Sequence, residues 1–454
     1  MINVKKTHLK RAAAFLLTAL MAGSALAGCG GSSSSSKADS SKADSSSTES
    51  KSDGGKGSVY WLNFKPELDE TLQGLAKKYK EAKGVDVKVV TAASGTYSET
   101  LTAEMDKSNP PTLFVIGNQQ GVKDWDEYAL DLTDTAIAKE LKTEDFNLKD
   151  ADGKLVSIGY CYECYGIVVN PDNVKAAGHT MDEIKDFNGL KTVAEDIHKK
   201  AKDLGFDAFS ATDMDDSSSW RVTGHLANLE YFYEEKAAGK TWSECPESIT
   251  GDYLPYYKNL FDLAINNSAT DAKDLATGGH DPMTQFTSGK STFFFTGSWD
   301  YAEISKTVPN AVMIPYYCGV EGEDKAGLNC GTENCWAVNA KASEDDQKAT
   351  IDFMVWLVSD AEASKTMVEQ LGILPYKNAP ESANGFLKNA DEYTQKGCYT
   401  MDWATNYQPN VDAYRADLVS ALNAYTADQS DANWDVVKEM FVDGWANQYK
   451  EVNG

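Results

Sequence analysis

From Ser58 onward, segments with an apolar residue at every second position alternate with segments whose apolar residues recur at helical spacing. Ser58–Phe64 is a β-rich, alternating run, which predicts a strand. Between Leu68 and Tyr79, apolar residues recur at helical spacing, and this pattern stops at Gly84. The same rhythm predicts a strand at 85–90, a helix at 97–107 and a strand at 111–117. Strands that alternate with helices predict an α/β fold with a parallel sheet and right-handed crossovers.

Candidate binding residues lie where these three strands end. Ligands of open parallel sheets bind in the crevice outside the carboxyl ends of the strands. The residues there are aromatic or carry amides: Trp61, Asn63, Tyr97, Asn118 and Gln119. Core packing for Trp61 and turn formation for Asn118 are the alternatives. No glycine-rich phosphate loop follows any of these strands, which argues against a nucleotide site.

A second group of candidates follows later strands. Thr292–Thr296 is apolar enough for a buried strand, and Gly297 permits a turn that carries Trp299 and Asp300 out of it. Trp220 lies near the start of a predicted helix, after a polar run. The tail from 406 onward has helical spacing that includes Tyr414.

The N-terminal pattern indicates export. Four basic residues precede the short apolar stretch Ala12–Ala27, and Leu26–Cys29 resembles the lipobox of bacterial lipoproteins. We therefore predict a signal peptide at 1–28 and lipidation of Cys29, with an ordinary secretory peptide as the alternative. Residues 29–57 are rich in Ser, Lys, Asp and Gly, and they predict a flexible tether because they cannot bury apolar surface.

Charge and cysteine usage narrow the class of protein. The formal net charge is −26, and loss of 1–28 with its four basic residues makes it −30, which disfavours nucleic acid and anionic lipid as partners. Seven cysteines follow Cys29. Cys161 and Cys164 have the spacing of a redox or half-zinc motif. However, residues three apart on a strand point to opposite faces, so we expect buried free thiols, and neither a metal nor a cofactor.

The order of several short blocks resembles extracellular solute-binding proteins, family 1, the maltose-binding-protein-like receptors of ABC sugar importers. The blocks are 111–115, 165–170, 289–293 with 297–299, 336–339 and 372–375. The resemblance implies a two-lobed periplasmic-binding-protein-like fold (type II) whose lobes are joined by three hinge crossovers. Lobe 1 would hold 58–163 and 318–371, and lobe 2 would hold 164–317 and 372–454.

The resemblance also implies a site between the lobes. A sugar needs flat aromatic side chains for its C–H faces, and fixed amides or carboxylates for its hydroxyls. Trp299 lies where the family places a ligand-stacking aromatic residue. Glu163, beside the first hinge, would accept sugar hydroxyls, with a buried salt bridge as the alternative. The full candidate set is Trp61, Asn63, Tyr97, Asn118, Gln119, Glu163, Trp220, Trp299, Asp300, Glu333, Tyr376, Trp403 and Tyr414.

The expected function is that of a monomeric, lipid-anchored receptor on the extracytoplasmic face of a bacterial membrane. It would capture a carbohydrate, in particular an oligosaccharide, and deliver it to ABC permease subunits without chemistry of its own. The alternatives are a surface glycoside hydrolase, a non-catalytic adhesion protein, and a receptor for a cation such as a polyamine, which Glu163, Asp300 and Glu333 would admit.

Overall fold

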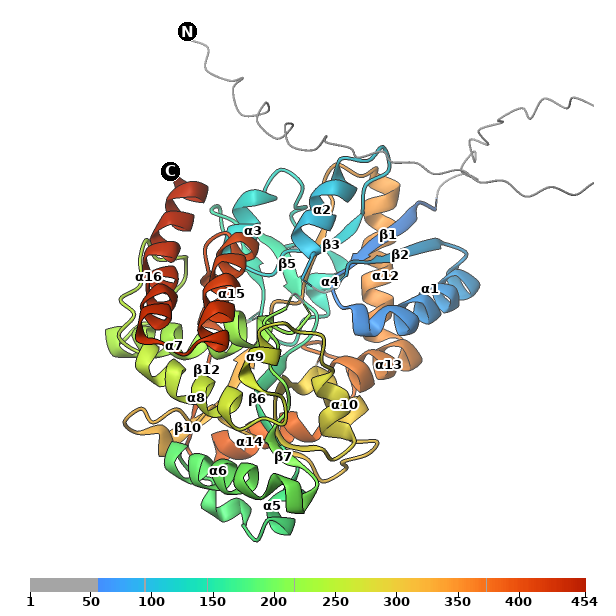
Figure 1. Cartoon of the computed structure of the whole chain (residues 1–454). Coiled ribbons are helices and arrows are strands. Elements are labelled where there is room, and N and C mark those ends of the chain that lie inside the picture. The colour runs from blue at the N-terminus through green and yellow to red at the C-terminus, as the bar shows by residue number, and fades with distance from the viewer. Residues whose placement is uncertain (1–55, 94, 145, 216, 373) are drawn as a thin grey trace, which may run out of the picture. The chain divides into compact units, whose positions relative to one another are not determined.

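The computed structural model describes residues 56–93, 95–144, 146–215, 217–372 and 374–454. The predicted signal peptide, the lipidation site Cys29 and nearly all of the predicted tether lie outside these residues. The described part holds two mixed sheets, each covered by helices (Figure 1). In this part, no helix is both long and apolar enough to cross a membrane.

The first sheet has the strand order β2-β1-β3-β11-β5-β4. Strand β1 pairs in parallel with β2 and β3, as the sequence predicts, while β11 runs antiparallel to both β3 and β5. The strands are β1 (Ser58–Asn63), β2 (Asp86–Thr91), β3 (Leu113–Val115), β4 (Leu148–Lys149), β5 (Leu155–Gly159) and β11 (Cys335–Val338).

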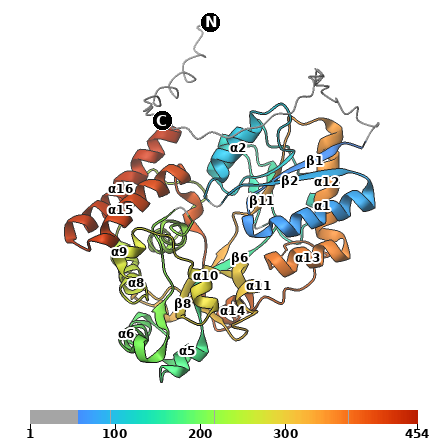
Figure 2. The same cartoon turned by 45° about the vertical axis from the view of Figure 1, so that its right-hand side comes forward.

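Helices cover both faces of this sheet. Side chains of successive strand residues point to opposite faces, so apolar residues of one strand contribute to a core on each face. In β1, Val59 and Trp61 join the core beneath α1 and α12, whereas Leu62 joins a smaller core on the other face with Leu101 of α2. Figures 1 and 2 show α12 beside β1 and α1 beside β2. The helices are α1 (Asp69–Lys83), α2 (Tyr97–Met105), α3 (Gln119–Asp124), α4 (Ala136–Lys139), α12 (Glu344–Ser359) and α13 (Ala361–Leu371).

The second sheet has the order β12-β10-β6-β8-β7, with β9 also paired to β6. Strand β6 is buried along its whole length. Its successive residues Ile167 and Val168 belong to two different cores, one on each face of the sheet. The strands are β6 (Glu163–Val169), β7 (Asp207–Phe209), β8 (Ser291–Gly297), β9 (Val312–Ile314), β10 (Ala326–Gly331) and β12 (Tyr399–Met401).

The helices of the second lobe include the last two of the chain, α15 and α16, which pack side by side (Figure 2). Their apolar faces join the larger core of the second sheet. The helices are α5 (Pro171–Ala176), α6 (Phe187–Leu204), a π-helical turn (Arg221–Leu226), α7 (Asn228–Ala238), α8 (Leu254–Asn266), α9 (Ala272–Leu275), α10 (Pro282–Thr287), α11 (Tyr301–Ile304), α14 (Gly385–Gln395), α15 (Val411–Ala427) and α16 (Asp431–Asn453).

The chain crosses between the sheets three times. The first crossover joins β5 to β6, and the second joins β10 to β11. The predicted lobe boundary at Cys318 must therefore move to 332–334, because β10 pairs with β6 and β12 of the second sheet. The boundary predicted at Gly372 also moves later. Leu374 and Tyr376 still pack in the core of the first lobe, and α14 is the next element of the second lobe.

Candidate ligand-binding site

A cavity of about 390 Å³ is lined by residues of both lobes. The first lobe contributes the loops after β1, β2 and β3, and the second contributes residues around the π-helical turn, the end of β8 and the start of α15. This is the strand-end location that the sequence pattern indicated. The cavity size is typical of small-molecule sites, which are concave and only partly apolar.

Three tryptophans and a histidine of the second lobe form an aromatic cluster in this cavity. The ring centroid of Trp299 lies 5.9 Å from that of Trp220 and 5.2 Å from that of His225. Trp403 lies 6.1 Å from His225 on the other side. Burial, and then the nearby Arg415, lower the pKa of His225 well below its ordinary value, so its imidazole is neutral. The cluster therefore presents a largely apolar surface of rings tilted against one another by 39–78°.

Local backbone features position this cluster. A Cβ on residue 297 would lie 2.1 Å from the indole of Trp299, so only glycine allows Trp299 to fold back over the end of β8. This close approach is the reason for Gly297, rather than the turn that the sequence suggested. The Trp220 indole donates to the carbonyl of Ser217 at 2.9 Å, and the Arg221 guanidinium lies 4.1 Å from its ring centroid. Both contacts hold Trp220 in one orientation.

A buried ion pair lies opposite the cluster. Lys65, in the loop after β1, donates from Nζ to Oε1 of Glu163 at 2.8 Å, and Oε2 of Glu163 accepts from Asn334 at 2.7 Å. Burial alone would lower the pKa of Lys65, but the nearby carboxylates of Glu163 and Glu67, together with the hydrogen bond to Glu163, raise that pKa above its ordinary value. Burial also raises the pKa of Glu163, against the opposing effect of Lys65. Glu163 directly follows the first crossover, and Asn334 lies in the second. The hydrogen bonds of Glu163 therefore connect both crossovers to Lys65 of the first lobe.

The rest of the lining is polar and acidic. Besides Glu163, the carboxylates of Glu67, Asp124, Glu333 and Asp412 line the cavity, against the cations Lys65 and Arg415. Burial raises the pKa of Asp124 and of Asp412. The Asn118 side chain accepts from the backbone N–H of Gly121 and thereby caps α3, which is the turn role considered as its alternative.

The cavity brings together seven of the thirteen residues predicted from the sequence. They are Tyr97, Asn118, Glu163, Trp220, Trp299, Glu333 and Trp403. The Tyr97 hydroxyl accepts from the backbone N–H of Val115 at 2.7 Å, so this ring also joins α2 to β3. Glu163 forms the buried salt bridge considered as its alternative role, and it also lines the cavity.

Three predicted ligand contacts are core residues instead. Trp61 is 1% exposed and packs against Trp336 and Phe353 beneath α12. Tyr376 is buried and donates to the carbonyl of Gly159 at 3.0 Å. Tyr414 is also buried, and its hydroxyl donates to the carbonyl of Phe441 at 2.9 Å. None of these side chains lines the cavity, because each completes the packing of its own lobe.

Three further predicted contacts do not line the cavity. Asn63 is buried, and its amide donates to the carbonyl of Lys65 at 2.6 Å, which shapes the loop that carries this lysine. Gln119 is the first residue of α3 and is not part of the cavity lining. The Asp300 carboxylate accepts from the hydroxyl of Thr296, and its burial raises its pKa. Asn63 and Asp300 thus hold a loop and a strand end in place.

The lining residues that the sequence analysis missed include Lys65, His225, Asp412 and Arg415. Lys65 follows the candidate Asn63 by two residues, and this proximity to a strand end was a usable signal. For His225, Asp412 and Arg415 the sequence offered no such signal, because a π-helical turn and the first turn of α15 bring them to the cavity.

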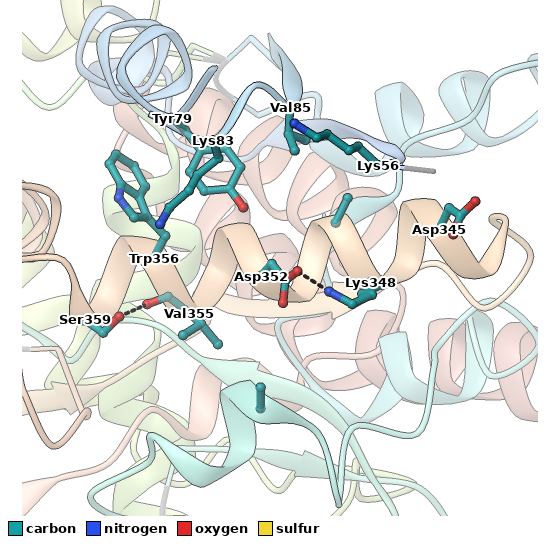
Figure 3. Close-up of a pocket in the computed structure, with 12 residues that line it drawn as sticks. Lys56, Tyr79, Lys83, Val85, Asp345, Lys348, Asp352, Val355, Trp356 and Ser359 are labelled. Atoms are coloured by element: carbon teal, nitrogen blue, oxygen red, sulfur yellow. Dashed lines mark hydrogen bonds and ion pairs between the residues drawn. The ribbon is translucent and has the colours of Figure 1, made fainter. Parts of the chain in front are cut away.

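A second hollow of about 490 Å³ lies between α1, α4 and α12 (Figure 3). All its lining residues belong to the first lobe, so closure of the lobes cannot enclose a ligand there. An exposed ion pair, in which Lys348 donates to Asp352 at 2.6 Å, is part of its lining, and Trp356 is its one tryptophan. The hollow therefore lacks the facing aromatic and polar surfaces of the cavity between the lobes.

Comparison with known proteins defines the class. Residues 74–383 match the bacterial extracellular solute-binding proteins, and the chain belongs to this family. This membership confirms the resemblance seen in the sequence and shows an extracellular binding protein. No curated protein matches the chain by sequence.

Solved structures confirm the two-lobed fold. A family 1 extracellular solute-binding protein from Bifidobacterium longum subsp. infantis shares 20% identity, with a TM-score of 0.57 and coverage of 87% of this chain and 100% of the other. A sugar transporter component from Bacillus licheniformis, solved with stachyose, shares 18% (TM-score 0.62; coverage 86% and 100%). A Streptococcus pneumoniae solute-binding protein, solved with the blood group A-trisaccharide, shares 19% (TM-score 0.59; coverage 86% and 99%).

Proposed function

We propose that the protein binds an oligosaccharide in the cavity between its lobes. The observation that carries this proposal is the aromatic cluster of Trp220, Trp299 and Trp403, which faces amide and carboxylate groups of the first lobe. Indole faces cover the C–H faces of sugar rings, and fixed polar groups satisfy the hydroxyls. The structural relatives solved with stachyose and with a trisaccharide support the same ligand class.

The mechanism is capture by closure rather than catalysis. Hinge motion at the three crossovers brings the polar loops of the first lobe onto a ligand stacked on the second lobe. The ligand stabilises the closed state only through its higher affinity for that state. The closed form then delivers its ligand to the permease subunits of an ABC importer.

Calorimetric titration of the protein with a panel of di- to pentasaccharides tests this proposal. We expect one member of the panel to bind with a stoichiometry of one and to raise the melting temperature. Chromatography after long incubation should recover that sugar intact, whereas a glycoside hydrolase would release smaller sugars. If no carbohydrate binds, the proposal fails.

A cationic ligand is the second candidate, because five carboxylates and only two cationic side chains line the cavity. Lys65 already neutralises part of this charge through its pair with Glu163. A polyamine would bind by charge, so its affinity would fall steeply between 50 mM and 500 mM salt, whereas that of a neutral sugar would change little. Titration with spermidine at both salt concentrations separates the two candidates.

We also propose that a lipid on Cys29 holds the protein at the membrane, and that the folded part is independent of it. The variant Cys29→Ser should therefore leave the membrane fraction and appear in the medium, with unchanged ligand affinity. The matched control is Ser36→Ala in the same N-terminal region, which should remain with the membranes. If Cys29→Ser stays in the washed membrane fraction, the assignment is wrong.

A further inference from the structure

Two cysteines face each other where the first two crossovers meet the second sheet. Cys164 is the second residue of β6, directly after the first crossover, and Cys330 is the last residue but one of β10, directly before the second. The two strands are antiparallel neighbours, and their register places Cys164 opposite Cys330. Both side chains lie in the same buried core, on one face of the sheet.

The backbone geometry at this pair suits a disulfide. The N–H of Cys164 donates to Oγ of Ser298 at 3.1 Å, on the β8 side of β6, so it points away from β10. Cys164 and Cys330 are therefore a non-hydrogen-bonded pair, for which the Cα atoms lie about 4.5 Å apart. Disulfides require a Cα separation of about 4.4–6.8 Å.

No other described cysteine lies opposite a second cysteine in the strand register. Cys161 precedes β6 and belongs to the core of the first lobe. Cys335 lies in β11, where its thiol donates to the carbonyl of Phe146 at 3.5 Å. The half-buried Cys245 donates to the carbonyl of Pro246. The cysteine opposite Cys164 is thus not Cys161, its neighbour in the sequence, but Cys330, which lies 166 positions further along the chain.

We propose that Cys164 and Cys330 are an oxidisable pair that forms a disulfide across β6 and β10. The oxidant is a small-molecule disulfide, RSSR, outside the cell. One protein thiolate attacks RSSR and releases RS⁻, and the second then displaces the other RS⁻ from the mixed disulfide. One S–S bond forms and one breaks, RSSR takes up two electrons, and the two thiol protons end on two RSH.

This disulfide would fasten the two strands beside the crossovers that permit hinge motion. The family is extracellular, and the extracellular environment favours disulfides. Burial raises the pKa of Cys164, which leaves little thiolate in the folded protein. Oxidation therefore takes place while the chain folds, before the core closes over the pair. This inference is independent of the ligand.

Refolding of the reduced full-length chain in a mixture of oxidised and reduced glutathione tests the inference at equilibrium. Free thiols are then alkylated, and the protein is digested with trypsin and a glutamate-specific protease. Glu163 lies between Cys161 and Cys164, and Glu333 lies between Cys330 and Cys335, so the digestion separates all four cysteines. We expect a reducible peptide pair that contains Cys164 and Cys330, and two fewer alkylated thiols than in the reduced protein.

Reduction should also lower the melting temperature by about 5 °C, because the bond closes a long loop. Cys330→Ala should lack both the linked peptide and this redox difference, whereas the matched control Cys335→Ala should keep both. If Cys330→Ala fails to fold, the peptide map of the refolded wild-type protein still shows whether Cys164 and Cys330 are linked. An unchanged thiol count after refolding, or a link between Cys161 and Cys335, overturns the proposal.

Discussion

Tryptophans lie near the ends of two central strands, Trp61 in β1 of the first lobe and Trp299 after β8 of the second. Trp61 still lies within its strand, on the face covered by α12, and packs against Trp336 and Phe353. Trp299 lies two residues beyond its strand and faces Lys65 of the other lobe, 5.7 Å from its ring centroid. The indole two residues past the end of its strand thus lies in the cavity, whereas the indole within its strand lies in the core.

Substitution of Trp61 should have the largest effect, because it empties the middle of the first core. We expect Trp61→Ala to lower the free energy of unfolding by about 3–5 kcal/mol, the usual loss for a buried large aromatic residue. Denaturant unfolding measures this change. Ligand affinity of the protein that remains folded should stay within about threefold of wild type, and a much larger loss of affinity with normal stability would place Trp61 in the site.

Substitution of Trp299 should have the converse effect. Loss of one stacking surface should cost about 2–4 kcal/mol of binding free energy, as at a binding hot spot. Trp299→Ala should thus weaken sugar binding by some tens- to several hundred-fold at about 1.4 kcal/mol per decade, while the melting temperature without ligand changes little. Calorimetry and a thermal melt of the same sample measure both effects.

The matched control for Trp299 is Trp356→Ala, in the hollow beside α12. This variant should bind the sugar with wild-type affinity. If Trp299→Ala keeps its affinity and melts many degrees earlier, then Trp299 is a core residue and the contrast with Trp61 is lost.

Two buried carboxylates, one in the cavity and one in the core, differ in the same way. We expect a smaller effect here, on the pH dependence of the free energy of unfolding. Glu163 in the cavity pairs with Lys65, whereas in α7 burial and the nearby Glu234 carboxylate raise the pKa of Glu230 from 4.5 to about 8. The folded state therefore holds a proton on Glu230 that the unfolded chain releases. The free energy of unfolding should fall as the pH rises from about 4.5 to about 8, because of this group.

Denaturant unfolding at several pH values measures this slope. Glu230→Gln keeps the shape of the side chain but removes its titration, so the slope should become less steep by up to about 1.4 kcal/mol per pH unit. The exposed Glu81 of α1 provides the control Glu81→Gln, which should leave the slope unchanged. An identical slope in wild type and Glu230→Gln would show that Glu230 is ionised in the folded protein.

Local sequence patterns predicted the alternation of strands and helices, and about half of the predicted site residues line the cavity. The alternation of 58–64 and the helical spacing of 68–79 correspond to β1 and α1, and Trp299 lies in the cavity after the end of β8. The same patterns could not separate Trp61 from Trp299, because burial depends on the helix that packs above. Strand β10 was assigned to the wrong lobe, since its pairing with β6 is a non-local contact.

The order of strands in the first sheet has a consequence for how the protein folds during export. Strands β2, β1 and β3 form one half of this sheet, β5 and β4 form the other, and β11 is the strand that pairs with both halves. A chain emerging from its N-terminus would expose two open sheet edges until residues 335–338 arrive, after most of the second lobe. Such late, long-range pairing slows folding and favours aggregation. The first lobe is thus expected to need protection by chaperones, although it is the first to leave the translocation channel.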